Sequence, residues 1–388
     1  MREVAVLGIG QTPADEHWDK SLRELAGEAV LASMQNAGLE SVEGLYVGNM
    51  ISGAASHQQH LGVYIADWVG LQHVSALRIE AACGSGSAAF RAALMAVASG
   101  ALDTAIAVGV EKMTDSPGTE ITAQLATAAD ADWELDQGVS FVALNALIMQ
   151  RYMHEYGWKH EHFAPFSINA HANAVHNPFA RFREPITEAQ YKRAPMVADP
   201  INLLDASPMA DGAAAAVLVP AEMLRRGGKG AVQRLITVAA SAAATDTISI
   251  HNRRDALWLS AAERSAREAY RQAGVQPEQI DVFEVHDAFT IMAALSLEAC
   301  GFAGRGQGPR LALDGEIGIH GRLPIATRGG LKARGHPVGA TGMYQTVEVV
   351  QQMRGEAGET QVADARIGMA QNIGGSGSNI LTHILRSG

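Results

Sequence analysis

The sequence predicts an α/β protein that contains two copies of one structural unit. A helix that ends at Ala-Gly and leads through an acidic link to a strand occurs at residues 21–48 and again at residues 258–285. Each half also carries a Gly-rich turn before a later helix, at Cys83 and at His336. Because strands alternate with helices in both halves, we expect layered sheets with helices between and outside them.

Composition restricts the classes of function. The chain has 388 residues, of which 47% are apolar and 18% are charged, so it can bury two cores and is not disordered. Its net charge of −11 argues against a nucleic-acid partner, since no basic stripe is present to neutralise phosphates. No run reaches the ~18 apolar residues of a membrane span, so we expect no membrane partner.

The cysteine count indicates a reducing compartment. The chain has two cysteines, Cys83 and Cys300, which are too few for a disulfide framework and suggest reducing surroundings. The first ten residues predict a strand rather than a signal peptide. We therefore expect a cytoplasmic protein.

The elements follow the same order in both halves. In the first half we expect strands at residues 1–10, 42–48, 74–79 and 104–109, with helices from Ser21 and over residues 88–98. Residues 205–219 return to this half as a turn and a strand. In the second half, a helix from Trp258, strands at 280–285 and 365–370, and the turn at His336 repeat the order.

Residues 116–199 interrupt the repeat. This segment lacks the strand–helix rhythm and is long for an unstructured loop, so we interpret it as an insertion that covers the cleft. The predicted organisation is residues 1–115 and 200–228 for the first half, 116–199 for the insertion, and 229–388 for the second half. The insertion holds five histidines that lack a ligand pattern with carboxylates, so we expect no metal site: His154, His160, His162, His171 and His176.

Cys83 carries the strongest chemical signal. An apolar run leads into Cys83-Gly84-Ser85-Gly86, and a small-residue helix follows. A thiol at such a strand-to-helix turn faces the free N–H groups of a helix, which favour a thiolate over a thiol. We therefore predict that Cys83 is a nucleophile with a lowered pKa.

Three further motifs accompany this turn. His286 lies in His-Asp-Ala-Phe, where a strand runs into a helix. His336 lies in Gly-His-Pro-Val-Gly-Ala-Thr-Gly, within the Gly-rich segment 329–342. The last motif, Gln-Asn-Ile-Gly-Gly-Ser-Gly, begins at Gln371 after the final predicted strand of the repeat.

With these motifs the chain resembles the thiolase superfamily over its whole length. The resemblance is closest to the archaeal acetoacetyl-CoA thiolases and the sterol-carrier-protein-x-type thiolases, and the Asp-Gly-Ala-Ala turn at Asp211 fits the same pattern. It implies a duplicated thiolase fold, layered α-β-α-β-α with two mixed sheets and an inserted loop domain. It also implies an acyltransferase of lipid metabolism that acts on coenzyme A thioesters and holds no permanent cofactor.

The resemblance assigns roles to the motif residues. Cys83 would carry the acyl group as a thioester, and His336 would take its proton. The N–H groups of Cys83 and Gly374 match the donors for the acyl oxyanion, while His286 and His336 match those around the enolate oxygen. Further candidates for substrate contact are Ser241, Phe289 and Asn372, with Arg181, Arg183, Lys192 and Arg193 as cations for the coenzyme A phosphates.

The chain departs from the family pattern at the second cysteine. Many thiolases carry a thiol in the C-terminal loop, where this chain has Asn372. The subfamily that it resembles often moves the thiol into His-Asp-Cys-Phe, where this chain has Ala288. Cys300 is expected in the core. Either His286 therefore moves the α-proton, or the enzyme performs a related acyl transfer.

Three functions remain open from the sequence. The leading one is a thiolase-type acyl-CoA C-acyltransferase acting on acetyl-CoA or a short 3-oxoacyl-CoA. The second is a Claisen-type acyltransferase with a non-CoA acceptor, related to ketoacyl synthases. The third is a thiolase-like subunit active only with a hydroxymethylglutaryl-CoA synthase and a small bridging protein. The resemblance also implies a homodimer or homotetramer, paired through a sheet edge near the nucleophile strand.

Overall fold

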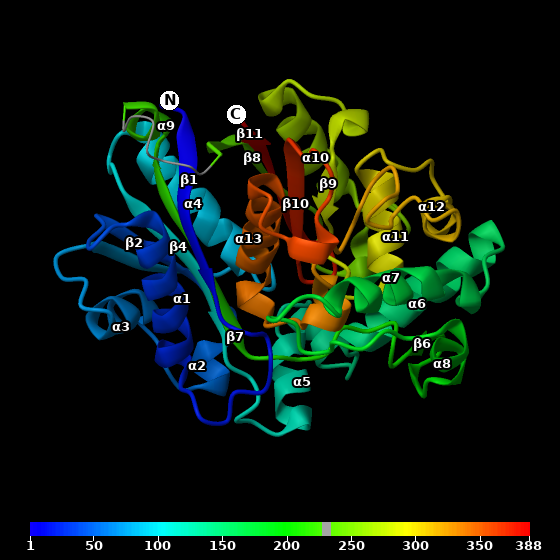
Figure 1. Ribbon diagram of the computed structural model, residues 1–388. Helices are drawn as coiled ribbons and strands as arrows, with labels where there is room; N and C mark the ends of the chain where they lie inside the picture. The colour runs from blue at the N-terminus through cyan, green and yellow to red at the C-terminus, as the bar shows by residue number, and fades with distance from the viewer. Residues whose placement is uncertain (227–233) are drawn as a thin grey trace.

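The computed structural model describes residues 1–226 and 234–388 and has the predicted α/β architecture (Figure 1). The expected boundary between residues 228 and 229 lies outside the described residues. The strands are β1 (Val4–Gln11), β2 (Gly44–Gly48), β3 (Ser75–Ile79), β4 (Ala105–Glu111), β5 (Met196–Ala198), β6 (Ile201–Asn202), β7 (Gly212–Pro220), β8 (Ile236–Thr245), β9 (Val282–Glu284), β10 (Ile367–Gly374) and β11 (Asn379–Ser387).

The helices alternate with these strands in both halves. They are α1 (Leu22–Ala37), α2 (Ser52–Ala55), α3 (Leu61–Trp68), α4 (Ser85–Ser99), α5 (Gly118–Ala126), α6 (Phe141–Tyr156), α7 (Ala164–Ala174), α8 (Glu188–Arg193), α9 (Ala221–Arg226), α10 (Ser260–Ala273), α11 (Thr290–Ala299), α12 (Gly308–Leu313) and α13 (Thr341–Arg354).

The main sheet repeats itself about its middle. Its strand order is β3-β2-β4-β7-β1-β8-β11-β10-β9, so β1, β7, β4 and β2 correspond to β8, β11, β10 and β9. Corresponding pairs run in the same sense: β1–β7 and β8–β11 are antiparallel, while β2–β4 and β9–β10 are parallel. The counterpart of the outer strand β3 in the second half is reduced to a single parallel bridge between Phe283 and Ile325. The sheet topology therefore agrees with the predicted duplication.

The two halves of the sheet meet at β1 and β8. Their antiparallel pairing involves only Ala5 with Thr237 and Val6 with Ile236. The two mixed sheets that were expected are therefore joined by this short junction into one mixed sheet of nine strands.

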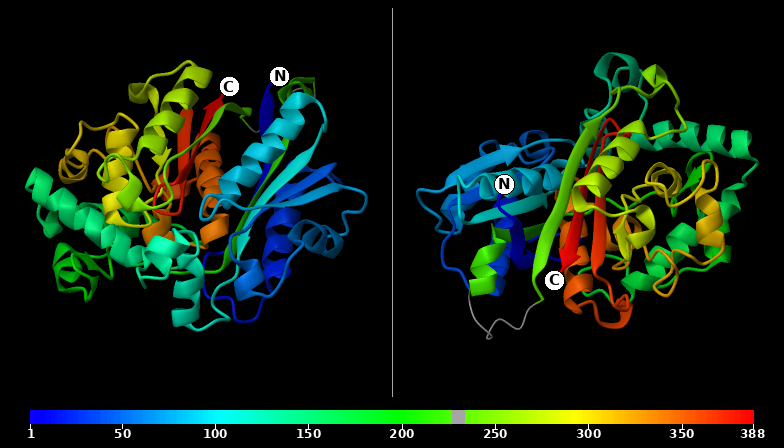
Figure 2. Two further views of the ribbon diagram at one scale, coloured as in Figure 1. Left: turned by 180° about the vertical axis from the view of Figure 1, so that it is seen from behind. Right: turned by 90° about the horizontal axis from the view of Figure 1, so that it is seen from above.

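Helices fill the space between the two halves and cover their outer faces. Helices α4 and α13 pack against each other in the middle layer, α1 covers the first half and α10 covers the second (Figures 1 and 2). The layer order is α-β-α-β-α, as expected for this fold.

The repeated helices end as the sequence predicts. Gly38 follows α1 at φ 66° and Gly274 follows α10 at φ 65°, a left-handed conformation that glycine adopts without a Cβ clash. Helix α1 begins at a capping box, in which the Ser21 N–H donates to Glu24 Oε2 at 2.8 Å and the Glu24 N–H donates to Ser21 Oγ at 3.4 Å. These local signals make the repeat visible in the sequence.

The segment between β4 and β7 contains α5 to α8 and the small β5–β6 hairpin. Three asparagines spaced by four residues connect it to the second half: Asn169, Asn173 and Asn177 donate to the carbonyl oxygens of Ile325, Ala326 and Arg328 at 3.1, 3.0 and 2.8 Å. Because those carbonyls precede the turn that carries His336, the segment helps to fix that turn.

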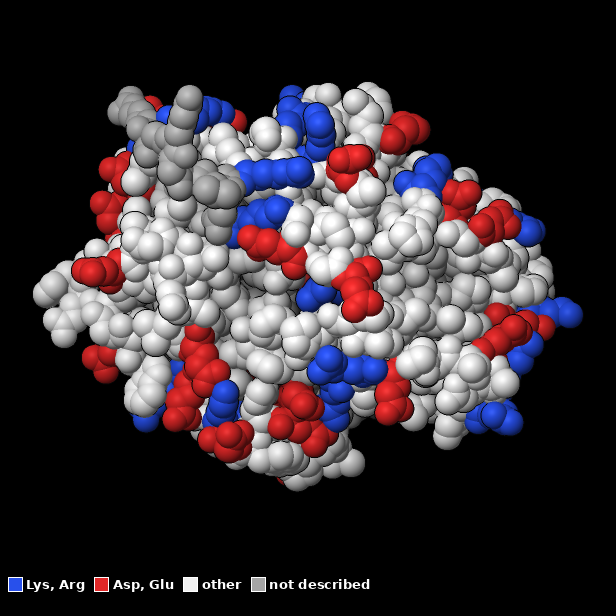
Figure 3. All heavy atoms as spheres, viewed as in Figure 1, with Lys and Arg blue, Asp and Glu red and all other residues white. Residues whose placement is uncertain are grey.

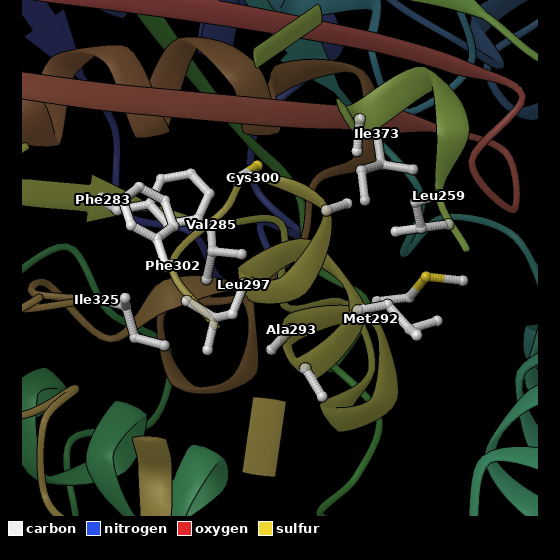
Figure 4. Packing of buried hydrophobic residues seen from close by; sticks show 14 of the residues in the cluster. Leu259, Phe283, Val285, Met292, Ala293, Leu297, Cys300, Phe302, Ile325 and Ile373 are labelled. Atoms are coloured by element: carbon white, nitrogen blue, oxygen red, sulfur yellow. The ribbon is translucent and has the colours of Figure 1, made fainter. Parts of the chain in front are cut away.

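Cys300 lies in the core of the second half. It is 2% exposed, and Figure 4 shows it among apolar side chains that include Val285, Leu297 and Phe302. The expectation that Cys300 is a core residue is therefore confirmed.

The surface carries both signs of charge. On the face shown in Figure 3, Lys and Arg side chains are interspersed with Asp and Glu. None of the helices in the described part of the chain combines the length and the apolar character needed to cross a bilayer.

Candidate active site

The N-termini of α4 and α13 cross at glycines, next to Cys83 and His336. A methyl group on Gly86 would lie 2.9 Å from the Gly339 carbonyl oxygen and 3.0 Å from the Met343 nitrogen. Only a hydrogen at this position lets the two backbones approach so closely. The turns that carry the two candidate residues are thereby held against each other, one from each half.

The turn that carries Cys83 is strained at the preceding residue, Ala82. Ala82 has φ 51°, which is uncommon for a residue with a Cβ. Ser85 braces the turn, because its Oγ accepts from the Ala81 N–H at 2.9 Å and donates to the Ala82 carbonyl oxygen at 2.6 Å. Cys83 is half-buried and packs beside Val338, two residues after His336.

The electrostatic surroundings correct the expected pKa of Cys83. Burial, together with the nearby Glu111 carboxylate, raises the pKa of this thiol to about 12, although the N–H groups of Cys83 and Gly375 act in the opposite direction. Desolvation disfavours the thiolate more than the helix N-terminus favours it. Cys83 is therefore a thiol at rest and needs a base when it attacks.

His336 has the hydrogen-bond pattern of such a base. Its Nδ1 lies 2.6 Å from Thr341 Oγ1, and that hydroxyl donates its one hydrogen to the Pro337 carbonyl oxygen at 3.2 Å. Thr341 must then accept from His336, so the ring proton sits on Nδ1 and Nε2 keeps its lone pair. Burial, His286 and Arg334 lower the pKa of His336, which keeps the ring neutral.

His286 lies against His336 and Asn372. The two imidazole centroids are 5.2 Å apart, and the Nδ2 of Asn372 lies 3.0 Å from the Nδ1 of His286. Burial first, and Arg334 second, lower the pKa of His286 to about 3. Asn372, a candidate for substrate contact, is fully buried in this position.

The C-terminal loop approaches the nucleophile turn through Gly374. A methyl group on Gly374 would lie 2.5 Å from the carbonyl oxygen of Ala81. The neighbouring Gly375 N–H faces the Cys83 thiol. Glycine is required here because the loop passes close to the backbone of the turn.

The two remaining candidates for substrate contact, Phe289 and Ser241, lie at the start of α11 and on β8. Phe289 caps α11 in the same turn as His286 and is half-buried. Ser241 lies on β8, where its Oγ accepts from Arg91 Nη1 at 3.1 Å and its N–H donates to Gln272 at 3.0 Å. The partners of Ser241 are therefore Arg91 and Gln272, and its role in substrate contact stays a prediction.

The cations expected for phosphate binding already have partners in two cases. Arg181 pairs with Glu16, and Lys192 pairs with Glu188 at 2.5 Å across one turn of α8. Within the described residues, no three His, Cys, Asp or Glu side chains are grouped so that they could hold a metal ion.

Two buried charged groups near the site were not predicted. Glu111 lies at the end of β4, where its carboxylate accepts from Asn49 Nδ2 at 2.7 Å and from the N–H groups of Met50 and Gly339 at 2.9 and 3.0 Å. It thereby ties the turn after His336 to the first half. In the sequence, Glu111 shows only as a charged residue at the end of an apolar strand. The same pattern is found for charged residues on a protein surface, so it did not predict a buried group.

Arg334 is the second unpredicted group. It is fully buried, its Nε lies 2.8 Å from Glu348 Oε1, and its guanidinium stacks 4.6 Å from the Tyr344 ring centroid. Its positive charge contributes to the lowered pKa of both histidines.

Comparison with known proteins identifies the family. The family model described as "Thiolase, N-terminal domain" matches residues 4–222, and "Thiolase C-terminal domain-like" matches residues 242–387. The chain belongs to the thiolase family. An acetyl-CoA acetyltransferase of Methanothermobacter thermautotrophicus is 47% identical over 386 residues, which are 99% of each chain. Sterol carrier protein 2 of Bos taurus is 29% identical over 394 residues, which are 98% of this chain and 71% of that protein.

A solved structure of a related protein agrees with the fold. The structure described as "Ltp2-ChsH2(DUF35) aldolase" matches with a TM-score of 0.86 and 26% identity, covering 99% of this chain and 98% of that chain. The resemblance to thiolases and the duplicated fold are both confirmed. This thiolase is an acyltransferase, as expected.

Proposed function

We propose that this thiolase transfers an acetyl group between coenzyme A thioesters through a thioester at Cys83, making or cleaving acetoacetyl-CoA or another short 3-oxoacyl-CoA. The observation that carries the proposal is the pair of contacting neutral imidazoles, His286 and His336, beside two turns that pack against the Cys83 turn: Gly86 lies against Gly339, and Gly374 lies against Ala81. The relative at 47% identity, an acetyl-CoA acetyltransferase, supports the substrate class.

The first half-reaction uses His336 and the backbone around Cys83. His336 Nε2 takes the thiol proton as Sγ attacks the thioester carbon of acetyl-CoA. The N–H groups of Cys83 and Gly374 are the proposed donors to the oxyanion that forms on the carbonyl oxygen. The departing thiolate of coenzyme A then takes the proton from His336, which leaves acetyl-Cys83 and a neutral imidazole.

The second half-reaction joins a second acetyl-CoA to this thioester. Loss of a proton from its methyl group gives an enolate, for which His286 is the proposed donor. The enolate carbon attacks the acetyl carbon on Cys83, and the thiolate of Cys83 leaves. No permanently bound cofactor takes part in this scheme.

A subunit that is active only in a complex is the second candidate. The solved relative is an assembly of Ltp2 with a second protein, ChsH2(DUF35). In addition, this chain has Ala288 and Asn372 at the two positions where the thiolase resemblance implies a second thiol. A hydroxymethylglutaryl-CoA synthase and a small bridging protein are the proposed partners in that case. A Claisen-type acyl transfer to a non-CoA acceptor is the enzymatic alternative.

Pairing of two copies is proposed through β3. This strand is the outermost of the main sheet and bonds to β2 along one side only within the described residues. Its Leu77 is 56% exposed, which leaves an apolar side chain next to an unpaired backbone edge. Light scattering of the purified chain at micromolar concentration should give a dimer or tetramer mass, and a monomer would contradict this pairing.

Thiolysis of acetoacetyl-CoA by the purified chain tests the proposed function. Loss of the enolate absorbance on addition of coenzyme A should depend on Cys83, so Cys83→Ala should remove the activity while leaving the circular dichroism unchanged. Acylation of Cys83 by acetyl-CoA without thiolysis would favour the Claisen-type alternative. Activity that appears only when a synthase and a bridging protein are added would favour the complex.

A further inference from the structure

Asn372 is placed to control the proton of His286. Both side chains are buried, at 0% and 3% exposure, and their closest polar atoms are Asn372 Nδ2 and His286 Nδ1, 3.0 Å apart. Asn372 lies on β10 and His286 follows the neighbouring parallel strand β9, so the contact joins two adjacent strand ends of one sheet.

The Asn372 amide oxygen lies beside the N-termini of two helices. A methyl group on Gly342 would lie 2.3 Å from Asn372 Oδ1 and 2.6 Å from the Ser87 nitrogen. Gly342 is in the first turn of α13 and Ser87 is in the first turn of α4, where free N–H groups concentrate partial positive charge. In this orientation the amide NH₂ group is directed at His286, while Oδ1 faces the two helix N-termini and accepts no hydrogen bond from a described residue.

An NH₂ group can only donate, so the His286 Nδ1 must accept and the ring proton must sit on Nε2. We propose that Asn372 is a positioning residue that holds His286 as its Nε2–H tautomer, so that His286 donates to the enolate oxygen and is not the base for the α-proton. The inference deepens the proposed function and rests on it for the identity of the substrate.

His336 then remains as the group that accepts the α-proton. Thr341 fixes its proton on Nδ1, so the two histidines hold opposite tautomers at adjacent positions. In the condensation, His336 Nε2 takes a proton from the acetyl methyl group while His286 Nε2–H bonds to the enolate oxygen. After carbon–carbon bond formation, the Cys83 thiolate takes that proton from His336, and the thiol and both neutral imidazoles are restored.

The charges around His286 are consistent with this arrangement. The groups that act on it are the neutral His336 ring and the Arg334 guanidinium, which Glu348 partly balances. The positive charge of Arg334 opposes a second proton on the His286 ring, so the neutral Nε2–H form persists at neutral pH.

Nitrogen NMR of the histidines reads the tautomer directly. In protein labelled with ¹⁵N-histidine, the shifts of protonated and unprotonated ring nitrogens are far apart, and His286→Gln identifies the His286 signals by their loss. The parent protein should show a protonated Nε2 and an unprotonated Nδ1 at His286. A protonated Nδ1 with a bare Nε2 would overturn the proposal.

The variant Asn372→Leu removes the donor and keeps the number and branching of the side-chain heavy atoms. His286 should then give shifts averaged between the two tautomers, and deuterium exchange into the acetyl-CoA methyl group should fall by about 10-fold to 100-fold. Acetylation of Cys83 should change by less than about threefold, because His336 serves that step. Retention of a pure Nε2–H tautomer in this variant would show that Asn372 does not set it.

Gln371→Met is the matched control. Gln371 is equally buried, precedes Asn372 on β10 and bonds to Thr382 at 3.0 Å on the other face of the strand. This variant should leave the His286 tautomer unchanged, and a change there would attribute the effect to disturbance of β10. The tautomer needs no turnover to be measured, so a parent without thiolysis would refute the proposed function and leave this test intact.

Discussion

His286 and His336 meet edge to face, with ring centroids 5.2 Å apart and ring planes inclined by 83°. Each ring uses its Nδ1 to contact a neighbouring side chain, Asn372 in one case and Thr341 in the other. The Nε2 atoms therefore remain for the substrate. Because one neighbour donates and the other accepts, two identical side chains acquire different chemical roles.

Removal of the Thr341 hydroxyl should impair His336 as a base. In Thr341→Val the Nδ1 proton of His336 loses its acceptor, so the ring can adopt the other tautomer, and the rate of Cys83 acetylation should fall about 10-fold to 100-fold. Burst-phase acylation by acetyl-CoA measures this step. Thr346→Val is the control, because Thr346 on the same helix also donates to a backbone carbonyl, that of Gly342 at 2.9 Å, but does not contact a histidine. Equal losses in the two variants would contradict the role of Thr341.

Alkylation should distinguish the two cysteines and report the state of Cys83. Iodoacetamide should label the half-buried Cys83 before Cys300, which is 2% exposed. Since the pKa of the Cys83 thiol is raised to about 12, its labelling rate should rise about 10-fold per pH unit between pH 7 and 9. Mass spectrometry of quenched samples gives both rates. A rate that is already constant at pH 7 would indicate a thiolate at rest.

Restoring the subfamily thiol should provide a second proton-transfer group. Ala288 is 8% exposed and lies two residues after His286, so Ala288→Cys adds one sulfur beside the enolate donor. We expect faster deuterium exchange at the methyl group of acetyl-CoA, measured by mass in heavy water. Ala288→Ser, of similar size but without an acidic thiol, should not accelerate exchange. Equal rates in parent and Ala288→Cys would show that the position does not reach the substrate.

Buried carboxyl groups should make the protein less stable as the pH rises from about 6.5 to 8. Burial raises the pKa of Glu111 to about 7, and burial with repulsion from Glu348 raises that of Glu284 to about 8. Unfolded carboxyls have already lost their protons in this window, whereas folded Glu111 releases its proton around pH 7 and folded Glu284 around pH 8. Each retained proton therefore lowers the free energy of unfolding by about 1.4 kcal/mol per pH unit.

Buried histidines should make the protein less stable as the pH falls below about 6.5. Burial lowers the pKa of His383 to about 3, so the unfolded chain gains protons below about 6.5 that the folded chain does not, and stability is lost as the pH falls. Chemical unfolding at pH 6.5 and pH 8 measures the upper window, and Glu284→Gln should reduce the decline. An equal change in stability between pH 6.5 and pH 8 in the parent and in Glu284→Gln would refute the proton retained on Glu284.

A methyl group at Gly342 should disturb the contact between the two central helices. It would lie 2.6 Å from the Ser87 backbone nitrogen and 2.3 Å from Asn372 Oδ1, so Gly342→Ala should lower the free energy of unfolding by about 1–3 kcal/mol. Gly118→Ala is the control, because a methyl group there meets no atom within 4 Å and should have little effect. Thermal unfolding of both variants tests this, and equal melting temperatures would contradict the close approach.

Local patterns carry much of the fold and the identities of the reactive residues. The two Ala-Gly helix ends, the glycine turns at Cys83 and His336, and the alternation of strands with helices all act over a few residues, so they are visible in the sequence. The raised pKa of Cys83 was not predictable in this way. It depends on burial by segments distant in sequence and on Glu111, whose closeness only the folded chain establishes.

The sequence by itself determined that the chain is a duplicated α/β acyltransferase, and it singled out a thiol and two histidines as the proposed reactive groups. Only the tertiary structure decided how these groups share the protons. The tautomer of His286 depends on Asn372, 86 residues away, and the turn of His336 is held by Glu111, 228 residues before Gly339. Hydrogen bonds between such distant residues form only where strands and helix N-termini converge, because their geometry is set by packing and not by neighbours along the chain.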